Sequence, residues 1–537
     1  MSFRGALPPR FRPIAARIRP HAARLARDEA GGMLVWSLFT LLGILLAVGL
    51  GIDVMRTETV RSHMQNTLDR AVLAAADLEQ DRTAEDVVRD FFTRSGLPGE
   101  KVNIDTEGSG INQKIVDANL TAQVGTVFLD MLGYDSLPAP TAGQAIESVT
   151  DVEVALVLDN SGSMGWSNNY RLNLLKPAAR DFIDTVVKPV PDGEPGVVSV
   201  SIVPFSTQVN AGPLLGAALN FSGEHDYSQC ADFADPMFGA TAISPATPLQ
   251  RAGHFDISTY DSPVDTYGVV CAFEGSRQIT PWSRDPDALK AQIDAMWAGG
   301  NTSIDVATKW GAALLDPALR PVLTQLEGEG EIDDRLLGRP YDYDRENTLK
   351  VLVVMSDGEN TTEFRLRDAY RSGTSPVWRD PATGVVSYFD EDSGQYFVFN
   401  GANLFAEPGG SWQSEPAGGA DAVNYTWPEL WDRMSVAHYA RLVKAEAIGG
   451  SWNAYYNEIY TSIGPATKNP RTSAICQAAR DAGIVIYTIG MDTYGQGDAT
   501  LEDCAGTTVN FFDVEATDIG VAFSAIARQI NQLRLTQ

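Results

Sequence analysis

The chain has 537 residues, with 41 basic and 69 acidic side chains and a net charge of −28. At about 150 residues per domain, this length predicts two to four folding units, one of them large enough for a substantial core. Four cysteines are too few for a small disulfide scaffold. So negative a charge excludes a nucleic-acid binder, which needs a basic surface against the phosphates.

The amino-terminal tail differs in charge from the rest of the chain. Residues 1–29 hold seven arginines against Asp28 and Glu29, a net charge of +5, whereas the following residues carry −33. Between the two parts, Gly31 to Ile52 form a run of 22 residues without a charge. As a helix at about 1.5 Å per residue, this run is roughly 33 Å long and predicts a membrane span.

The two alternatives to a span are a buried core helix and a cleaved signal peptide. A core helix would show a polar stripe, and a signal peptide would have a shorter apolar run and a small-x-small cleavage site. The run shows neither feature and leads directly into Asp53 and Arg56. We therefore expect a retained single-pass anchor at 30–53, with the basic tail cytoplasmic and the bulk of the chain outside.

The segment after the anchor, 54–150, predicts an exported stalk helix followed by short strands and turns. Apolar residues recur at helical spacing along the first part, in the order Val60, Met64, Leu68, Ala71, Val72, Ala75. The second part ends in SLPAPTAGQA, residues 136–145, whose prolines and small residues indicate a connector and a domain boundary.

Residues 151–537 predict alternating strands and helices. Expected strands cover 152–158, 197–205, 349–355 and 483–489, and expected helices cover 173–187, 289–297, 303–315 and 518–533. Continuous apolar runs such as VEVALVL are typical of strands buried on both faces. The expected fold class is therefore α/β, with a doubly wound, mainly parallel sheet that binds ligands at the carboxyl ends of its strands.

Oxygen-bearing side chains gather at those strand ends. The first strand runs into Asp159, Ser161 and Ser163, Thr302 lies in a loop before a helix, and Asp357 follows the third strand. Carboxylate and hydroxyl oxygens suit Mg²⁺, which takes octahedral oxygen ligands. A serine-rich turn is the alternative, but five suitable groups at strand ends and in loops favour a metal site.

These five positions resemble the metal-ion-dependent adhesion site of von Willebrand factor type A domains. The resemblance implies that they bind one Mg²⁺ or Mn²⁺, whose last ligand is an acidic side chain of a partner protein. It covers residues 151–537, with two insertions expected at about 211–285 and 364–470.

The anchor and the helix after it resemble the TadE/TadG-like proteins of tight-adherence (Flp) pilus assembly. The resemblance lies in RDEAGGMLVWSLFTLLGILLAVGLGIDVMR, LDRAVLAAA and FLDMLGYDS. It implies a bacterial inner-membrane protein whose exported part meets pilus or envelope components in the periplasm or outside the cell. Pilin-like members cleaved by a prepilin peptidase carry a Glu soon after the cleavage glycine. Here no acidic residue lies between Met33 and Phe39, so we expect an uncleaved anchor rather than a pilin.

All four cysteines lie in the exported part, where disulfides persist. Three pairings are possible, and neighbours in sequence form the simplest, Cys230 with Cys271 and Cys476 with Cys504. The alternative is four buried thiols; no Cys/His spacing supports zinc.

The second insertion is rich in aromatic residues, with 16 in the 85 residues from 376 to 460. VVSYFD and QYFVF flank a turn and predict a hairpin. The aromatic side chains could form the insertion's own core or a recognition surface.

No nucleophile elbow, phosphate loop or HExxH motif is present, and the five histidines are scattered. The expected function is therefore not enzymatic: a membrane-anchored protein that holds a partner's carboxylate through Mg²⁺ in pilus assembly or surface adhesion. The alternative is a structural anchor of an envelope complex, in which the metal only stabilises the fold. A metal hydrolase ranks third, because no general base accompanies the five groups.

Overall fold

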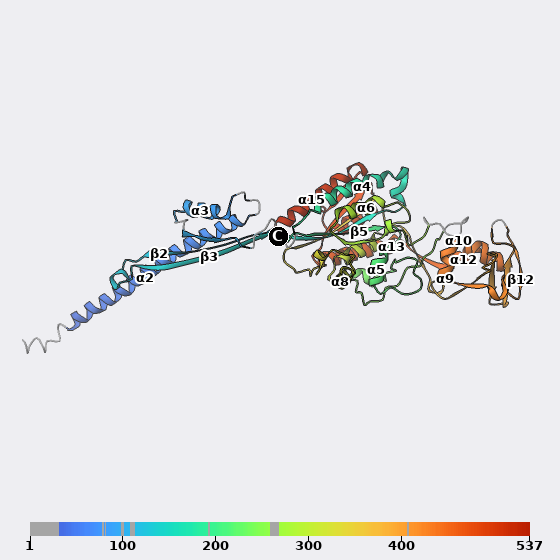
Figure 1. Ribbon diagram of the computed structural model, residues 1–537, viewed down its shortest axis with the longest axis horizontal. Coiled ribbons are helices and arrows are strands. Elements are labelled where there is room, and N and C mark those ends of the chain that lie inside the picture. Colours follow the sequence, from blue (N-terminus) through green and yellow to red (C-terminus); the bar gives the residue numbers. More distant parts are fainter. Residues whose placement is uncertain are drawn as a thin grey trace, which may run out of the picture. The chain divides into compact units, whose positions relative to one another are not determined.

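The computed structural model describes residues 32–536 apart from 78–79, 81, 98–100, 108–112, 192–193, 258–267 and 405–406. The basic tail expected at 1–29 lies outside the described residues. The chain divides into two compact units, Met1–Glu147 and Ser148–Gln537 (Figure 1). Each unit has its own hydrophobic core.

The first unit is built on one long helix, α2 (Gly32–Ala76). Its first part is apolar and exposed, and it is long and apolar enough to cross a membrane. The expected anchor and stalk helix therefore form one continuous helix, with no break at the end of the apolar run.

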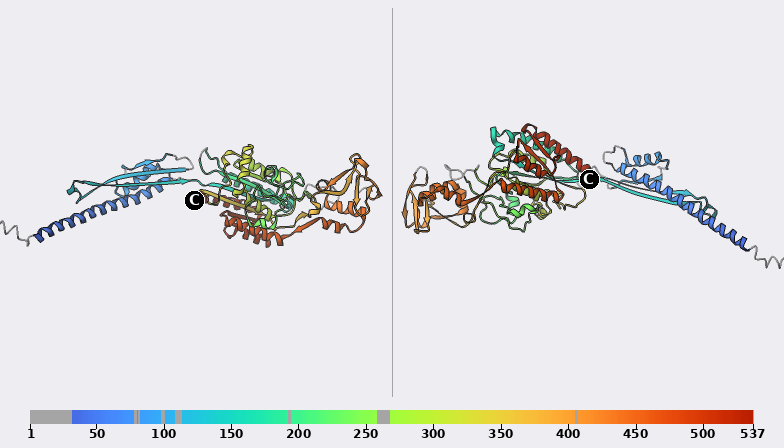
Figure 2. Two further views of the ribbon diagram at one scale, coloured as in Figure 1. Left: turned by 90° about the horizontal axis from the view of Figure 1, so that it is seen from below. Right: turned by 180° about the vertical axis from the view of Figure 1, so that it is seen from behind.

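The last part of α2 buries the predicted apolar stripe. Met64, Leu68 and Val72 pack against α3 (Ala84–Arg94) and a three-stranded sheet in the order β1-β2-β3. The strands are β1 (Asn103–Asp105), β2 (Gln113–Gly125) and β3 (Ser136–Ser148). Both views of Figure 2 show β2 and β3 running beside α2.

The prediction of a connector at residues 136–145 was wrong. These residues belong to β3, a strand of 13 residues. β3 lies at the edge of the sheet, where Pro138 and Pro140 are tolerated because an edge strand has backbone N–H groups that need no ladder partner. The compositional signal of a linker thus marked an edge strand.

The second unit is organised around a six-stranded sheet in the order β16-β15-β7-β4-β5-β6. Five strands are parallel, and the edge strand β6 is antiparallel to β5. The order reverses between β4 and β7, as in a doubly wound sheet, which confirms the expected fold class. The strands are β4 (Asp151–Asp159), β5 (Val198–Phe205), β6 (Thr280–Ser283), β7 (Thr348–Ser356), β15 (Val485–Met491) and β16 (Phe511–Val514).

Helices cover both faces of this sheet because its central strands are apolar on both sides. Along β4, Val154, Leu156 and Leu158 face one core, and Ala155 and Val157 face the other. The first core is closed by α4 (Trp166–Val186), α6 (Pro286–Ala295) and α15 (Ile519–Thr536). The second is closed by α5 (Gly212–Ala218), α7 (Ile304–Leu314), α8 (Arg320–Gly328), α13 (Pro465–Asp481) and α14 (Gln496–Ala505).

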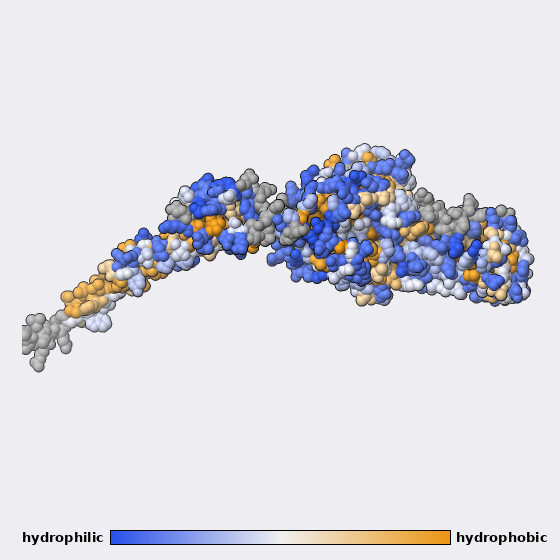
Figure 3. Space-filling model, viewed as in Figure 1, coloured by the Kyte–Doolittle hydropathy of each residue, from blue (hydrophilic) through white to orange (hydrophobic). Residues whose placement is uncertain are grey.

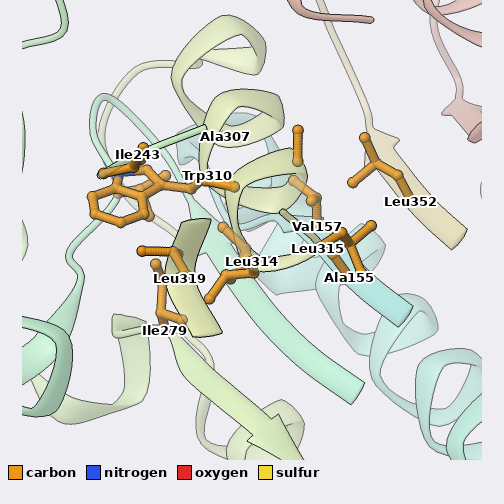
Figure 4. Packing of buried hydrophobic residues seen from close by; sticks show 14 of the residues in the cluster. Ala155, Val157, Ile243, Ile279, Ala307, Trp310, Leu314, Leu315, Leu319 and Leu352 are labelled. Atoms are coloured by element: carbon orange, nitrogen blue, oxygen red, sulfur yellow. The ribbon is translucent and has the colours of Figure 1, made fainter. Parts of the chain in front are cut away.

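Figure 4 shows how the second core is filled. Trp310 of α7 lies among aliphatic side chains, beside Ile243, and Leu314 lies on the side of Leu319. Ala155 and Val157 of β4 belong to the same core. The four expected strands and four expected helices are all present, with bounds shifted by a few residues. α4 begins earlier than predicted, but Ser167, Asn168 and Asn169 have positive φ, so its regular part starts near the predicted residue.

The predicted disulfide pairs are confirmed. Cys230–Cys271 pins the irregular segment between β5 and β6, and Cys476–Cys504 joins α13 to α14. The edge strand β6 falls inside the range expected as the first insertion.

The second insertion is a separate lobe, residues 367–459, on a two-stranded stem of β8 (Glu363–Leu366) and β14 (Tyr460–Ile463). Its five-stranded sheet has the order β12-β11-β10-β9-β13, and the predicted hairpin is β10–β11. Val377, Phe399 and Trp431 are buried in its core, as expected for the first of the two readings. The other elements are β9 (Thr374–Arg379), β10 (Val386–Asp390), β11 (Gln395–Phe399), β12 (Gly410–Gln413), β13 (Val423–Thr426), α9 (Trp427–Arg433), α10 (Val436–His438), α11 (Ala445–Ile448) and α12 (Trp452–Ile459).

Candidate functional site

The candidate site lies at the carboxyl ends of the neighbouring strands β4 and β7. Asp159 is the last residue of β4, and Asp357 follows Ser356, the last residue of β7. Because the two strands pair in parallel, with Leu158 opposite Met355, their ends meet at one edge of the sheet. The hydroxyl of Ser356 donates to Asp159 Oδ2 at 2.6 Å, which fixes the carboxylate at the first strand end.

The turn after β4 brings both serines to the carboxylates. The Ser161 N–H donates to Asp159 Oδ1 at 2.7 Å, and the Oγ atoms of Ser161 and Ser163 lie 3.1 Å apart. Ser163 Oγ donates in turn to Asp357 Oδ1 at 2.7 Å. Four of the five predicted residues are therefore linked in one hydrogen-bonded chain.

Thr302, the fifth predicted residue, lies in the loop before α7. Its N–H donates to Thr361 Oγ1 at 2.7 Å, and its carbonyl accepts from the buried Lys468 Nζ at 2.7 Å. Thr302 lines the same cavity of about 570 Å³ as Ser163 and Asp357. The loop that carries Thr302 is thus held in place by its backbone, which leaves the threonine side chain at the cavity.

The two carboxylates at the site are both held out of water. Burial first, and the neighbouring Asp357 second, raise the pKa of Asp159 from 3.8 to about 7. Burial also raises the pKa of Asp357, against the opposing effects of the Ser163 hydrogen bond and of Arg171. Two buried acids that disfavour each other's charge form a site that a cation would stabilise.

Arg171 of α4 is a site residue that sequence reasoning missed. Its Nη1 donates to Asp357 Oδ2 at 2.9 Å and its Nε to Asp492 Oδ2 at 3.0 Å. Asp492 directly follows β15, so the same strand-end rule that found Asp357 could have found it. No sequence signal distinguishes Arg171 from an exposed arginine on a helix face. Lys468, which holds the Thr302 loop, was missed for the same reason.

The set of donors fits a hard divalent cation. Two carboxylates and three hydroxyls offer only oxygen, the ligand type of Mg²⁺ and Mn²⁺. Within the described ranges, no group of three or more His, Cys, Asp or Glu side chains is placed to hold a metal. The expected site would not form such a group, because it has only two carboxylates and its other three ligands are hydroxyls.

Comparison with solved structures finds, among others, a vWF domain of a pilus tip protein, a pilus adhesin and a protein of the mussel byssus. The vWF domain of the type V pili tip protein Mfa5 from Porphyromonas gingivalis is 14% identical, with 72% of this chain and 96% of that chain covered and a TM-score of 0.31. The pilus adhesin RrgA from Streptococcus pneumoniae is 10% identical, covering 80% and 49%, with a TM-score of 0.31. A proximal thread matrix protein of the mussel byssus with a zinc-occupied MIDAS motif is 9% identical, covering 71% and 48%, with a TM-score of 0.27.

At these scores, the fold assignment of the second unit rests on its own strand order rather than on the likenesses. No curated protein matches the chain. Residues 31–78 match the family described as "Putative Flp pilus-assembly TadE/G-like". The resemblance to TadE/TadG-like proteins that the sequence indicates is therefore confirmed over the anchor and the helix that continues it.

Proposed function

We propose that this protein is a membrane-anchored, exported binding protein that holds a partner through a divalent cation at the ends of β4 and β7. The ligands in this proposal are Asp159, Ser161, Ser163, Thr302 and Asp357. The observation that carries it is the hydrogen-bonded chain from Asp159 through both serines to Asp357, beside the cavity that Thr302 lines.

The charge of the site supports a cation rather than a neutral ligand. Asp159 and Asp357 are both buried, and of these two Arg171 at the rim forms an ion pair with Asp357 alone. A bound Mg²⁺ or Mn²⁺ would supply the missing positive charge and an open coordination position for a carboxylate of the partner. The protein's own part is to orient the oxygens, through Ser356 and the Ser161 N–H at Asp159 and through Lys468 behind Thr302.

The proposed place of action is the outer side of a bacterial inner membrane. The apolar part of α2 and the family match at residues 31–78 support an anchored protein related to pilus assembly. The excess of arginine in residues 1–29 supports a cytoplasmic amino terminus. The partner is then a pilus or envelope protein that presents an acidic side chain. In this proposal the cation binds and does not catalyse.

The test is capture of partners from intact cells by the tagged full-length protein, with and without EDTA. Wild type is expected to capture a partner in Mg²⁺ and to lose it in EDTA, and Asp159→Ala is expected to lose it in both. Asp294→Ala is the matched control, because Asp294 is an exposed acid on α6 whose ion pair with Arg180 lies on the surface. Capture by wild type that persists in EDTA would refute the proposal.

A structural role for the first unit is the second candidate. It is favoured by the separate core of that unit, where α2 packs on α3 and the β1-β2-β3 sheet. A chain ending at residue 150 would then still join the envelope complex, whereas the binding proposal requires the second unit.

A further inference from the structure

The connection between β2 and β3, residues 126–135, forms a tip that folds back onto α2. This hairpin tip contacts the helix at Asp53, whose carboxylate accepts three backbone N–H groups. Val127 donates to Oδ1 at 3.0 Å, and Phe128 and Leu129 donate to Oδ2 at 2.8 Å each. Asp53 is buried as a result, although it lies on a helix whose neighbouring residues are exposed.

A second contact places the hairpin tip still closer to the apolar part of α2. Phe128 lies on Gly49, so near that a Cβ added there would come within 2.5 Å of the ring. Gly49 is one turn before Asp53 and inside the apolar run that ends at Ile52. At a rise of about 1.5 Å per residue, the hairpin tip therefore lies beside the last ~5 Å of the apolar run along the helix axis.

The outer side of the hairpin tip is apolar and open to solvent. Met131 is 84% exposed, Tyr134 62%, Val127 56% and Leu132 52%. These side chains are not packed within the unit, and a group of exposed apolar side chains marks an interaction surface. Figure 3 shows the first part of α2 as the long apolar surface of this unit. The contacts at Gly49 and Asp53 fix the hairpin tip at the carboxyl-terminal end of that apolar part.

We propose that the hairpin tip inserts into the outer interface of the lipid bilayer, beside the point where α2 leaves it. This inference rests on the membrane anchoring in the proposed function and adds a second membrane contact to it. Tyr134 has the amphipathic ring typical of that layer, and Met131 and Leu132 supply apolar area. The tip carries Asp130 and Asp135 and no basic residue, so the contact is hydrophobic and needs no anionic lipid.

The Asp53 carboxylate explains how the tip is held at this depth. Three unpaired backbone N–H groups would be costly near hydrocarbon, and here each has a charged acceptor. The Asp53 carboxylate is in turn shielded by these three donors. Both the carboxylate and the three N–H groups therefore have hydrogen-bond partners at the membrane surface. Gly49 admits the Phe128 ring, and larger residues at this position would push the tip outward.

The test uses the full-length protein in zwitterionic phosphatidylcholine vesicles, with an environment-sensitive fluorophore on one added cysteine. Three matched variants carry it at Met131→Cys, Ile44→Cys and Leu73→Cys, all exposed positions of the first unit far in sequence from the native disulfides. Lipids bearing a nitroxide quencher at a shallow or a deep position report the depth. Leu73 lies roughly 30 Å beyond Ile52 along α2 and serves as the water-exposed control.

The expected result is strong quenching at Met131 by the shallow nitroxide, strong quenching at Ile44 by the deep one, and none at Leu73. Adding Gly49→Leu to the Met131 variant is expected to remove its quenching and leave that of Ile44 intact. If Ile44 is quenched and Met131 is not, the tip proposal fails while the anchor stands. If Ile44 is not quenched, the membrane anchor itself fails. A Met131 probe with blue-shifted emission but no quenching would show that protein covers the tip, which also overturns the proposal.

Discussion

Replacing Asp159 by Asn is expected to stabilise the metal-free protein, although it removes a proposed metal ligand. Burial and Asp357 raise the pKa of Asp159 from 3.8 to about 7. The folded state thus keeps a proton between about pH 4 and pH 7 that the unfolded chain has released, and stability falls as pH rises through this window. At about 1.4 kcal/mol per pKa unit, the loss above pH 7 reaches at most about 4 kcal/mol.

Asn removes this penalty and keeps most of the hydrogen bonds. Its oxygen still accepts from the Ser161 N–H, and its amide can donate to the Ser356 hydroxyl, which rotates to accept. Asp159→Asn should therefore raise the free energy of unfolding at pH 8 in EDTA by up to about 4 kcal/mol and change it little at pH 4. Mg²⁺ should stabilise wild type and leave the variant unaffected.

Hydrogen exchange of the β4 and β7 amides in urea measures this free energy for the second unit of the full-length protein. Asp151→Asn is the control, because Asp151 begins the same strand and its carboxylate accepts the Gly196 and Val197 N–H groups. That variant should be destabilised at pH 8. If Asp159→Asn lowers stability at pH 8 in EDTA, or shifts it equally at pH 4 and pH 8, the reasoning about the buried carboxylates is refuted.

Three further outcomes are expected. Arg171→Met removes a positive charge that pairs with Asp357, so Mg²⁺ should bind about tenfold more tightly by calorimetry, and equal or weaker binding would contradict this. Replacing Cys476 and Cys504 by Ala opens a loop of 28 residues and should cost about 3.5 kcal/mol in urea unfolding, whereas an unchanged midpoint would count against it. Trp431→Ala leaves a cavity in the core of the lobe and should cost about 3–5 kcal/mol of lobe stability, measured by proteolysis. Mg²⁺ affinity at the β4–β7 site should be retained, and loss of that affinity would link the lobe to the site.

The central fold could be predicted because burial on both faces leaves a strong mark in a sequence. Strands such as VEVALVL in β4 and LKVLVVM in β7 are uninterrupted apolar runs, and the amphipathic helices between them imply parallel order. β3 could not be predicted in this way. As an edge strand it tolerates Pro138 and Pro140, and prolines next to small residues look the same in a linker.

The candidate site could be predicted as far as its residues follow strands. Asp159 and Asp357 stand directly at strand ends, where topology places ligands. Arg171 could not be predicted, because its partner Asp357 lies 186 residues away and an arginine on a helix usually faces water. FLDMLGYDS entered the sequence analysis only as part of the resemblance to TadE/TadG-like proteins. Its role as a hairpin tip could not be predicted, because the contact with Asp53 depends on the fold of the whole first unit.

The arrangement of β3 beside β2 has a mechanical consequence. The second unit begins at Ser148, the last residue of β3, so a pull on that unit enters the first unit along this strand. The hydrogen bonds between β2 and β3 lie across that direction and are loaded together, in shear, rather than one at a time. Gln65 on α2 also donates to Ala142 of β3. Under the proposed function, traction from a bound partner would thus be spread over the hydrogen bonds of the β2–β3 pair before it reaches the membrane.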